Sequence, residues 1–526
     1  MAGSITAMQR TWLIAAVALL VLGGAAPRGQ SPFDSGTPAR PGNRIDELVF
    51  ARLKGLGIQP APLCSDAVFL RRAHLDLTGT LPTVDEARAF LADTNPNKRG
   101  VLVDRLLARD EYSDLWAMRW SDALRVKSEF PINLWPNAVQ AYHRWIRTMI
   151  RDNVPWDRVA REILVSNGSN FRDAPVNFYR AVQGRDPNTI ASAVALAFMG
   201  TRTDTWPKDR LAAMGAFFSQ VAYKPTGEWK EEVVYFDPSK PRGTATFPDG
   251  SAARIAPGQD PREAFAAWLT APGNPWFARS LVNRYWFWML GRGIVHEADD
   301  LRPDNTPANP ELLAHLEREF VASRYDVKRL LKLITNSTTY QLSSVPARGG
   351  SGAAAQANFA HALLRPLEAE VLADALCQIT GTHEQYASPI PEPYTYIPPD
   401  QRSIGLPDGS ITSAFLETFG RATRDTGLLS ERNVRPTAAQ RLWLLNSSDV
   451  QRKLQQGPGL LALVSGRSDA RDVVSTLYLA VLSRFPSGAE MTTALGYLQA
   501  NGTNRRTAGQ DLVWALVNTA EFRYRH

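Results

Sequence analysis

Apolar residues recur along most of this 526-residue chain with the period of an α-helix rather than that of a β-strand. In RIDELVFARLKGLG, the residues Ile45, Leu48, Val49 and Leu53 form one apolar stripe that ends at glycine, as in an amphipathic helix. The same spacing recurs in SDAVFLRRAHLDLTG, AYHRWIRTMIRDN, PELLAHLEREFVAS and EVLADALCQITG. The pattern therefore predicts a mainly α, multi-helical fold.

Residues 223–258 interrupt this helical pattern. The segments EWKEEVVYFDP and GTATFPDGSAARIA alternate apolar and polar residues and contain an Asp-Gly turn, as the strands of a hairpin do. We predict a small β insert here, laid on the helices, between two helical halves at residues 44–222 and 259–526. No repeat of 20 to 50 residues is evident, which argues against a solenoid array.

The N-terminus has a composition of its own. Arg10 precedes the apolar run TWLIAAVALLVLGGAA, and no acidic residue occurs before Asp34. This is typical of a secretory signal peptide, residues 1–26, cleaved after about Ala26. The Pro-, Gly- and Ser-rich residues 27–43 are expected to be a flexible leader. We therefore predict an extracytoplasmic protein, periplasmic or secreted, and an uncleaved N-terminal membrane anchor is the alternative.

The net charge, the absent motifs and the cysteine count exclude several classes of function. The formal charge of +7 is spread along the chain, so no nucleic-acid partner is expected. The sequence has no Gly-x-Ser-x-Gly elbow, phosphate loop, dinucleotide fingerprint or His-Glu-x-x-His motif. Its two cysteines, Cys64 and Cys377, exclude a four-cysteine metal site. Two free buried thiols are expected, although the sequence leaves a disulfide between them open.

One loop, VHEADDLRPDNTPANPELL at residues 295–313, carries candidate metal ligands. Oxygen atoms are the ligands that Ca²⁺ prefers in proteins. The candidates for such a site are Glu297, Asp299, Asp300, Asp304 and Asn305. The spacing is not that of an EF-hand, and the alternative is a polar loop in which Asn309 or Asp304 caps the next helix.

Two segments are candidates for a ligand surface. The aromatic run at residues 276–288 could expose Trp276, Trp286 and Trp288 as a platform for sugars; packing of these rings inside the fold is the alternative. The polar segment at residues 166–187 could form a pocket wall with Asn170, Arg172, Asn177 and Arg180. A solvated loop is the alternative for that segment.

The order of several blocks resembles a known pair of domains. FLRRAHLDLTGTLPTVDEARAFLAD, YSDLWAMRWSDALRVKSE, AYHRWIRTMIRDNVPWDRVAREIL and GSNFRDAPVNFYRAV resemble the planctomycete cytochrome c-associated domain, an exported module without an established function. NPWFARSLVNRYWFWMLGRGIVHEADDLRPDNTPANPELL, LLRPLEAEVLADALCQITG and LYLAVLSRFPSGAEMTTALGYL resemble its usual companion, a planctomycete-specific C-terminal domain also of unknown function. The resemblance covers about residues 44–526.

The chain departs from this resemblance at two places. In the family, the block equivalent to Phe198–Arg202 runs into Cys-x-x-Cys-His, the motif that covalent haem c attachment needs. Here only Thr203, Asp204 and Thr205 precede Trp206. The family also has Cys-x-Cys-Glu-Arg after its FGR block, where this chain has Leu428 and Ser430 in place of the thiols. The joint absence suggests that the two elements form one metal, haem or disulfide site in relatives, and predicts that they lie close together in space.

The resemblance implies no established reaction. We expect an exported helical protein of unknown activity, most simply a non-catalytic binding or scaffold component of an extracytoplasmic complex. Family neighbours suggest another exported, sulfatase-like protein as its partner. The alternative is an enzyme or accessory in the degradation of extracytoplasmic polysaccharide, including sulfated polysaccharide. Electron transfer is disfavoured because the haem c motif is absent, and no other cofactor is expected apart from the calcium candidate. The sequence determines neither the substrate nor the oligomeric state.

Overall fold

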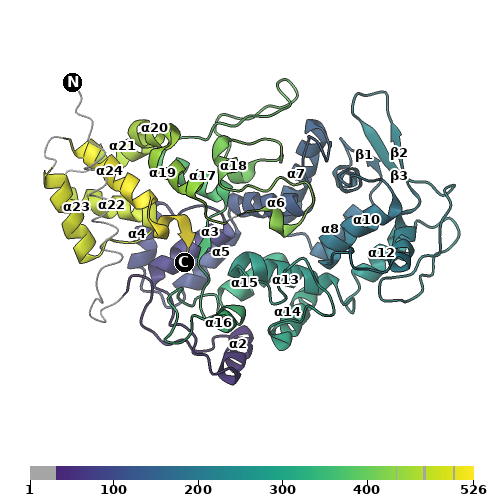
Figure 1. Cartoon of the computed structure of the whole chain (residues 1–526), viewed down its shortest axis with the longest axis horizontal. Helices are drawn as coiled ribbons and strands as arrows, with labels where there is room; N and C mark the ends of the chain where they lie inside the picture. Colours follow the sequence, from purple (N-terminus) through teal and green to yellow (C-terminus); the bar gives the residue numbers. More distant parts are fainter. Residues whose placement is uncertain (1–30, 434, 466–468, 501–503) are drawn as a thin grey trace.

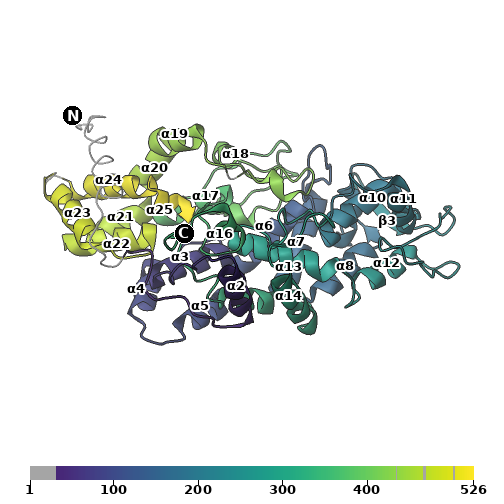
Figure 2. The same cartoon turned by 60° about the horizontal axis from the view of Figure 1, so that its bottom comes forward.

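The computed structural model describes residues 31–433, 435–465, 469–500 and 504–526. The predicted signal peptide therefore lies outside the described residues. Figure 1 and Figure 2 show an elongated, mainly helical body with the C-terminal helices at one end and a small sheet at the other. The predicted mainly α fold is confirmed. None of the described helices is both long and apolar enough to span a membrane.

Ten α-helices precede the larger strands in the described chain. They are α2 (Arg44–Gly55), α3 (Asp66–Leu77), α4 (Val84–Ala92), α5 (Lys98–Leu107), α6 (Asp110–Ala123), α7 (Pro136–Arg151), α8 (Trp156–Leu164), α9 (Asn177–Arg180), α10 (Pro187–Val194) and α11 (Lys208–Gly215). Local signals place several of their starts. Thr83 and Glu86 form the capping box of α4, in which each side chain bonds the other residue's backbone N–H.

The second half is also helical. Its helices are α12 (Pro261–Leu269), α13 (Phe277–Leu290), α14 (Pro310–Ala322), α15 (Val327–Thr335), α16 (Ala353–Ala357), α17 (Ala369–Thr380), α18 (Ala414–Thr418), α19 (Ala438–Asn446), α20 (Ser448–Gln456), α21 (Pro458–Ser465), α22 (Ala470–Leu482), α23 (Gly488–Ala500), α24 (Arg505–Val517) and α25 (Ala520–Arg523). A two-stranded antiparallel pair, β4 (Arg365–Pro366) with β5 (Tyr524–Arg525), ties the C-terminus to the start of α17.

The predicted β insert is present in part. Strands β2 (Val221–Pro225) and β3 (Glu232–Phe236) form an antiparallel hairpin, and β3 also pairs with β1 (Gly168–Ser169). The second predicted segment forms only an isolated bridge, between Thr246 and Ala252. There Phe247 turns inward and stacks on Phe217 and Trp268, with ring centroids 4.9 and 5.0 Å away. Packing of this ring therefore replaces strand pairing.

The apolar interior forms two cores that do not follow the predicted halves. The first core draws on residues from α2 to α15, continues to Ala360 and includes Leu479 of α22. The second core joins α17 through α24 to four residues of the first half, Leu75, Leu81, Leu115 and Met118. Helix α6 serves both cores, because Trp116 and Trp120 belong to the first while Leu115 and Met118 face the second. The two cores therefore meet along α6.

Candidate functional site

The end of α10 continues into a π-helical turn, Ala195–Met199, which leads to the connector before α11. Gly200 follows with φ of 58°, and a Cβ there would lie 2.9 Å from the Cβ of Ser280. Both the left-handed backbone and the closeness of α13 therefore favour glycine. Arg284 and Ser280 of α13 donate hydrogen bonds to three carbonyls of the turn. These donors satisfy carbonyls that the helix end leaves without intrahelical partners.

The connector itself, residues 201–207, is anchored at its start and exposed at its turn. Thr201 donates to the carbonyl of Leu301 at 3.1 Å. The N–H of Leu301 donates to the carbonyl of Gly200 at 2.8 Å. Residues 204–205, where the resemblance places a missing segment, lie exposed in the turn. The connector therefore pairs with the acidic loop that follows α13.

Asp299 of that loop joins the connector to a third segment of the chain. Its side chain is only 2% exposed. Asp299 Oδ1 accepts a hydrogen bond from Arg202 Nη2 at 2.7 Å, and Oδ2 accepts one from the N–H of Leu429 at 3.0 Å. Both segments that the resemblance marks as departures thus contact one carboxylate, and their predicted proximity is confirmed. We call Arg202, Asp299 and the Leu429 N–H the Asp299 joint.

The charge of Arg202 is stabilised within the joint. Arg202 also bonds Glu297 at 2.8 Å, and the Glu297 side chain is largely exposed. Burial by itself would lower the pKa of Arg202, but Asp299 and Glu297 outweigh it and raise the pKa above its ordinary value. Arg202 is therefore a permanent cation facing a buried carboxylate.

The other acidic residues of the loop face a second arginine. Arg302 pairs with Asp300 at 3.1 Å and with Asp304 at 3.7 Å, and Asn305 donates to the carbonyl of Asp300 at 2.9 Å. Asn309 caps α14, as the alternative interpretation of this loop predicted. In the described parts of the chain, no group of three or more His, Cys, Asp or Glu residues is arranged to hold a metal ion. The calcium site stays a hypothesis from sequence, and the geometry shows its proposed ligands in ion pairs and hydrogen bonds.

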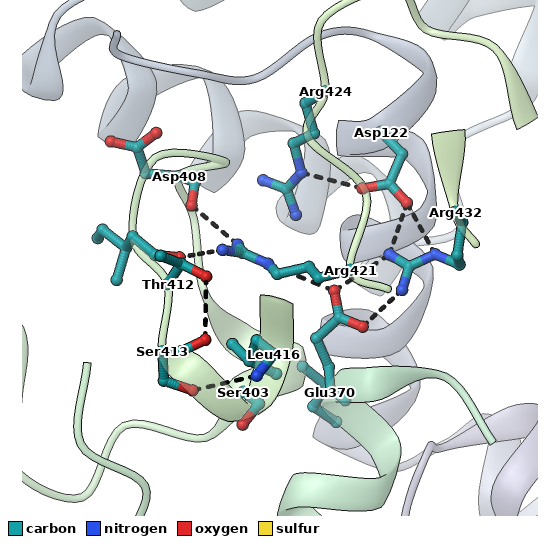
Figure 3. Close-up of polar contacts among 12 residues, drawn as sticks. Asp122, Glu370, Ser403, Asp408, Thr412, Ser413, Leu416, Arg421, Arg424 and Arg432 are labelled. Atoms are coloured by element: carbon teal, nitrogen blue, oxygen red, sulfur yellow. Dashed lines mark hydrogen bonds and ion pairs between the residues drawn. The ribbon is translucent and has the colours of Figure 1, made fainter. Parts of the chain in front are cut away.

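The segment that contains Leu429 also contributes to a buried cluster of three arginines and two carboxylates (Figure 3). Arg432 bridges Asp122 on α6, at 2.7 Å, and Glu370 on α17. Arg424 pairs with the other oxygen of Asp122 at 2.9 Å, and Arg421 lies 3.4 Å from Glu370. We call these five residues the arginine network.

The arginine network is nearly closed to water, since its side chains are between 1 and 13% exposed. Burial, together with repulsion from Arg424, lowers the pKa of Arg421 to about 10. Burial would also lower the pKa of Arg432, but Asp122 and Glu370 raise it well above the ordinary value. Removing one partner from a buried pair of this kind strands a charge and costs about 3–5 kcal/mol. The network is therefore a structural joint.

The arginine network also holds the irregular segment before α18. Arg421 Nη2 donates to the carbonyl of Asp408 at 2.9 Å, as Figure 3 shows. The Asp408 carboxylate in turn accepts the N–H of Ser128 at 3.0 Å. Arg424 donates to the carbonyl of Pro407 at 2.9 Å. Arg421 and Arg424 thus hold the backbone of residues 407–408, and the Asp408 side chain ties that segment to the loop that follows α6.

Comparison with family models matches two stretches of the chain. Residues 44–220 match PSCyt2, described as a protein of unknown function (DUF1549). Residues 261–498 match PSD1, described as a protein of unknown function (DUF1553). The chain belongs to these two families. This is the order and identity that the sequence predicted. No curated protein and no solved structure matches the chain.

The Asp299 joint and the arginine network both lie between the PSCyt2 and PSD1 segments. Arg202 and Asp122 belong to PSCyt2, whereas Asp299, Glu370 and Arg432 belong to PSD1. Each joint therefore pairs charges across the two family segments. The seam between them is made of specific ion pairs as well as apolar packing.

The residues present at the joint do not fit covalently attached haem c. Thioether attachment needs two thiols and an imidazole close together, and residues 203–205, Leu428 and Ser430 supply neither. Cys64 and Cys377 lie elsewhere, just before α3 and on α17. Both are free thiols, as expected, although Cys377 is only partly buried.

The aromatic half of the predicted ligand surface is not at the surface. Trp286 is fully buried and Trp288 is 7% exposed. Trp288 packs edge-on against Trp116 and Trp120 within the first core. Trp276 is partly buried and lies 5.7 Å from the ring of Trp268. Burial of Trp286 and Trp288 contradicts the expectation of a sugar platform on these two rings, because other elements pack around α13 on most sides.

The polar half of the predicted ligand surface is mostly interior as well. Asn170 and Asn177 have no exposed surface, and the side chain of Arg180 is 10% exposed where it pairs with Glu232. Arg172 alone lies open, with 75% of its side chain exposed. These residues do not line a shared pocket wall. Three of them instead hold loop backbone in place, because each donates to a backbone carbonyl.

Sequence reasoning missed the arginine network. Arg421 and Arg432 stood inside recognised blocks, but no pattern named their partners. Asp122 and Glu370 are charged residues on helices whose neighbouring positions are buried. A charge at a core-facing position is the available signal, since an unpaired buried charge is very costly.

Proposed function

We propose that this protein is a non-catalytic, exported component of an extracytoplasmic complex, in which it acts as a binding scaffold. The single observation that carries the proposal is the Asp299 joint. At the place where the resemblance puts a reactive motif, this chain has a carboxylate closed by Arg202 and by the Leu429 N–H. An acid whose oxygens are already occupied is poorly placed to exchange protons with a substrate.

The arginine network supports the same proposal. Asp122 and Glu370 are each held by two arginines, so these carboxylates serve packing between the PSCyt2 and PSD1 segments. Buried ion pairs that hold the PSCyt2 and PSD1 segments together suit a scaffold, because a rigid protein presents its outer loops in a constant arrangement. A sulfatase-like exported protein is the partner that the family resemblance suggests.

A second candidate is an enzyme or accessory in polysaccharide degradation. The observation in its favour is a group of exposed aromatic side chains on loops, including Trp229 at 59% and Tyr394 at 48%. Hydrolysis in most glycosidases needs two carboxyl groups about 5–9.5 Å apart on either side of the glycosidic bond. The carboxylates of both joints face arginines instead. This favours binding over cleavage.

The test uses the exported chain without its signal peptide, residues 27–526. We expect chemical cross-linking in the native exported fraction, followed by mass spectrometry and light scattering, to show one exported partner at a constant ratio. We expect the purified chain to release no new reducing ends from neutral, carboxylated or sulfated polysaccharides beyond a boiled control. Release of reducing ends that an Asp299→Asn or a Glu297→Gln exchange abolishes would overturn the proposal.

A further inference from the structure

Three aromatic side chains from distant parts of the chain meet at the surface. Trp135 precedes α7, Trp229 lies between β2 and β3, and Tyr394 lies in the proline-rich segment before α18. The ring of Trp229 is 4.7 Å from that of Trp135 and 5.4 Å from that of Tyr394, and the remaining pair is also 5.4 Å apart. Together with Lys230, we call these residues the aromatic site.

Two rings of the aromatic site are open to solvent, and Trp135 is partly buried. Trp229 is 59% and Tyr394 is 48% exposed. The ring planes meet at 58 to 73°, so they form an angled surface instead of a closed stack. Large apolar rings left in water at one place mark an interaction surface more often than chance exposure does. An open, angled surface suits a long ligand that passes over it.

Two residues of the aromatic site have unfavourable backbone conformations. Trp135 has φ of 75° and ψ of 147°, and Lys230 has φ of 64°. Residues other than glycine rarely adopt such backbone angles, and backbone strain of this kind concentrates at functional positions. Here the two conformations bring the side chains together, since Lys230 Nζ lies 5.1 Å from the ring centroid of Trp135.

Buried polar residues beneath the site hold these backbones. Asn170 donates to the carbonyl of Lys230 at 3.2 Å and accepts the N–H of Glu232 at 2.9 Å. Arg180 donates to the carbonyl of Leu134, the residue before Trp135, at 3.1 Å. Asn170 and Arg180 are therefore positioning residues of the aromatic site, although neither reaches its surface.

The cation of the site is available to a ligand. Lys230 Nζ lies over the rings of Trp135 and Trp229, at 5.1 and 5.6 Å. Among the described residues it makes no ion pair. A cationic ligand would be repelled from rings that already face an ammonium group. An anionic group that lands beside the rings would instead find an unpaired positive charge.

We propose that the aromatic site binds an anionic polysaccharide, with a sugar ring stacked on Trp229 or Tyr394 and its carboxylate or sulfate paired with Lys230. The apolar face of a sugar ring fits an exposed aromatic face, and its charged substituent lies at the ring edge, within reach of the ammonium group. This inference rests on the proposed non-catalytic binding role and names the class of ligand.

Single-stranded nucleic acid also stacks on aromatic rings, but it needs a track of cations along its phosphates. At the aromatic site, Glu228 precedes Trp229 and lies 4.0 Å from Arg172. An acidic residue at that position interrupts such a track. The local charges therefore favour a sugar with isolated anionic groups.

The test measures binding of the exported chain by affinity electrophoresis in gels that contain dextran, dextran sulfate or polygalacturonate, with oligothymidylate as a separate probe. We expect retardation by at least one of the two charged polysaccharides and little by dextran. Trp229→Ala should weaken that binding about five- to tenfold, and Tyr394→Ala serves as a second variant. Lys230→Gln should remove most of the difference between dextran and the charged polysaccharide that binds.

Phe485→Ala is the matched control, because Phe485 is 46% exposed and lies far along the chain from the aromatic site; it should leave binding unchanged. Binding of dextran as strong as that of both charged polysaccharides, no effect of either aromatic exchange, or tighter binding of oligothymidylate would each overturn the proposal. If the chain binds neither charged polysaccharide but still assembles with its exported partner, the aromatic site proposal fails and the scaffold function stands. Polysaccharide binding without an exported partner would support the aromatic site proposal and contradict the scaffold function.

Discussion

Arg202 and Asp299 stand 97 positions apart in the sequence, and their side chains meet at 2.7 Å. The same carboxylate accepts the backbone N–H of Leu429, a further 130 positions along the chain. The connector, the acidic loop and the segment after α18 are thus held by one buried acid. This contact links the two segments that the family resemblance marks as departures.

Replacing Asp299 should destabilise the fold. Asp299→Ala leaves Arg202 without its buried partner and the Leu429 N–H without an acceptor, so we expect a loss of about 2–4 kcal/mol in the free energy of unfolding. Guanidinium denaturation followed by circular dichroism measures it. Glu297→Ala is the control, since Glu297 bonds the same arginine from an exposed position, and should cost under about 1 kcal/mol. Equal effects of both exchanges would contradict the role given to Asp299.

The arginine network should be more sensitive than any surface pair. Arg432→Ala removes one of the two arginines that hold each of Asp122 and Glu370, and we expect a loss of about 3–5 kcal/mol. Arg44→Ala breaks an exposed pair with Glu47 whose side chains are 59 and 53% exposed, and should cost about 0–1 kcal/mol. Denaturation midpoints of the two variants compare them. Similar midpoints would show that the network does not stabilise the seam.

Stability should fall in mild acid because of buried histidines. Burial, with Arg424 and Arg147 nearby, lowers the pKa of His143 to about 3 from its ordinary value of 6.5. Between these two values the unfolded chain binds a proton that the folded chain does not, so the free energy of unfolding decreases as the pH falls from 6.5 toward 3. The slope is about 1.4 kcal/mol per pH unit for one such group.

His143→Gln should reduce that slope, whereas the wild type keeps the full dependence. Melting temperatures between pH 7 and pH 4.5 measure it, above the range in which most carboxylates titrate. His74 and His526, whose pKa values burial also lowers to about 3, should still contribute in the variant. Parallel curves for wild type and variant would contradict this prediction.

The two cysteines should react only after unfolding. Burial raises the pKa of the Cys377 thiol to about 11, although Lys453 opposes the change, and Cys64 is buried. Thiolate is the reactive form, so a chromogenic disulfide reagent at pH 8 should titrate native protein slowly. Guanidinium without reductant should reveal both thiols. Fewer than two would indicate a disulfide and contradict the free thiols of the structure.

The chain should not acquire covalent haem. When the protein is produced in cells that attach haem c, we expect no Soret absorbance after denaturing gel electrophoresis, because residues 203–205 offer no thiol. A relative that carries the Cys-x-x-Cys-His motif is the matched control. Covalent haem on the wild-type chain would show that another residue serves as the attachment point.

Much of the local structure could be predicted from the sequence. The capping box at Thr83 and Glu86 and the strand at residues 232–236 follow from neighbouring residues alone, although that strand pairs with residues 221–225 and not with the predicted second segment. Phe247 shows the limit of such reasoning. Its segment has a strand pattern, but stacking on Phe217 and Trp268 decides its conformation. These two rings come from other helices, and no local sequence pattern indicates that Phe247 will contact them.

The candidate site was likewise predicted only in part from the sequence. The sequence pointed to the connector, to Asp299 and to the segment at residues 428–432, because residue types there break a family pattern or gather charge. It misplaced Trp286 and Asn170, since neither the helical period nor polarity tells which neighbours will cover a side chain. Asn170 is buried although it is polar, because two backbone groups of β3 and its turn satisfy it.

By itself the sequence determined the helical composition, the order of the PSCyt2 and PSD1 segments and the absence of a haem c motif, because these depend on residues near one another in the chain or on residue identity. Only the tertiary structure decided that Arg202, Asp299 and Leu429 meet, and that Trp135, Trp229 and Tyr394 share one surface. Contacts across hundreds of residues depend on how two apolar cores pack along α6, and that packing is a property of the whole chain.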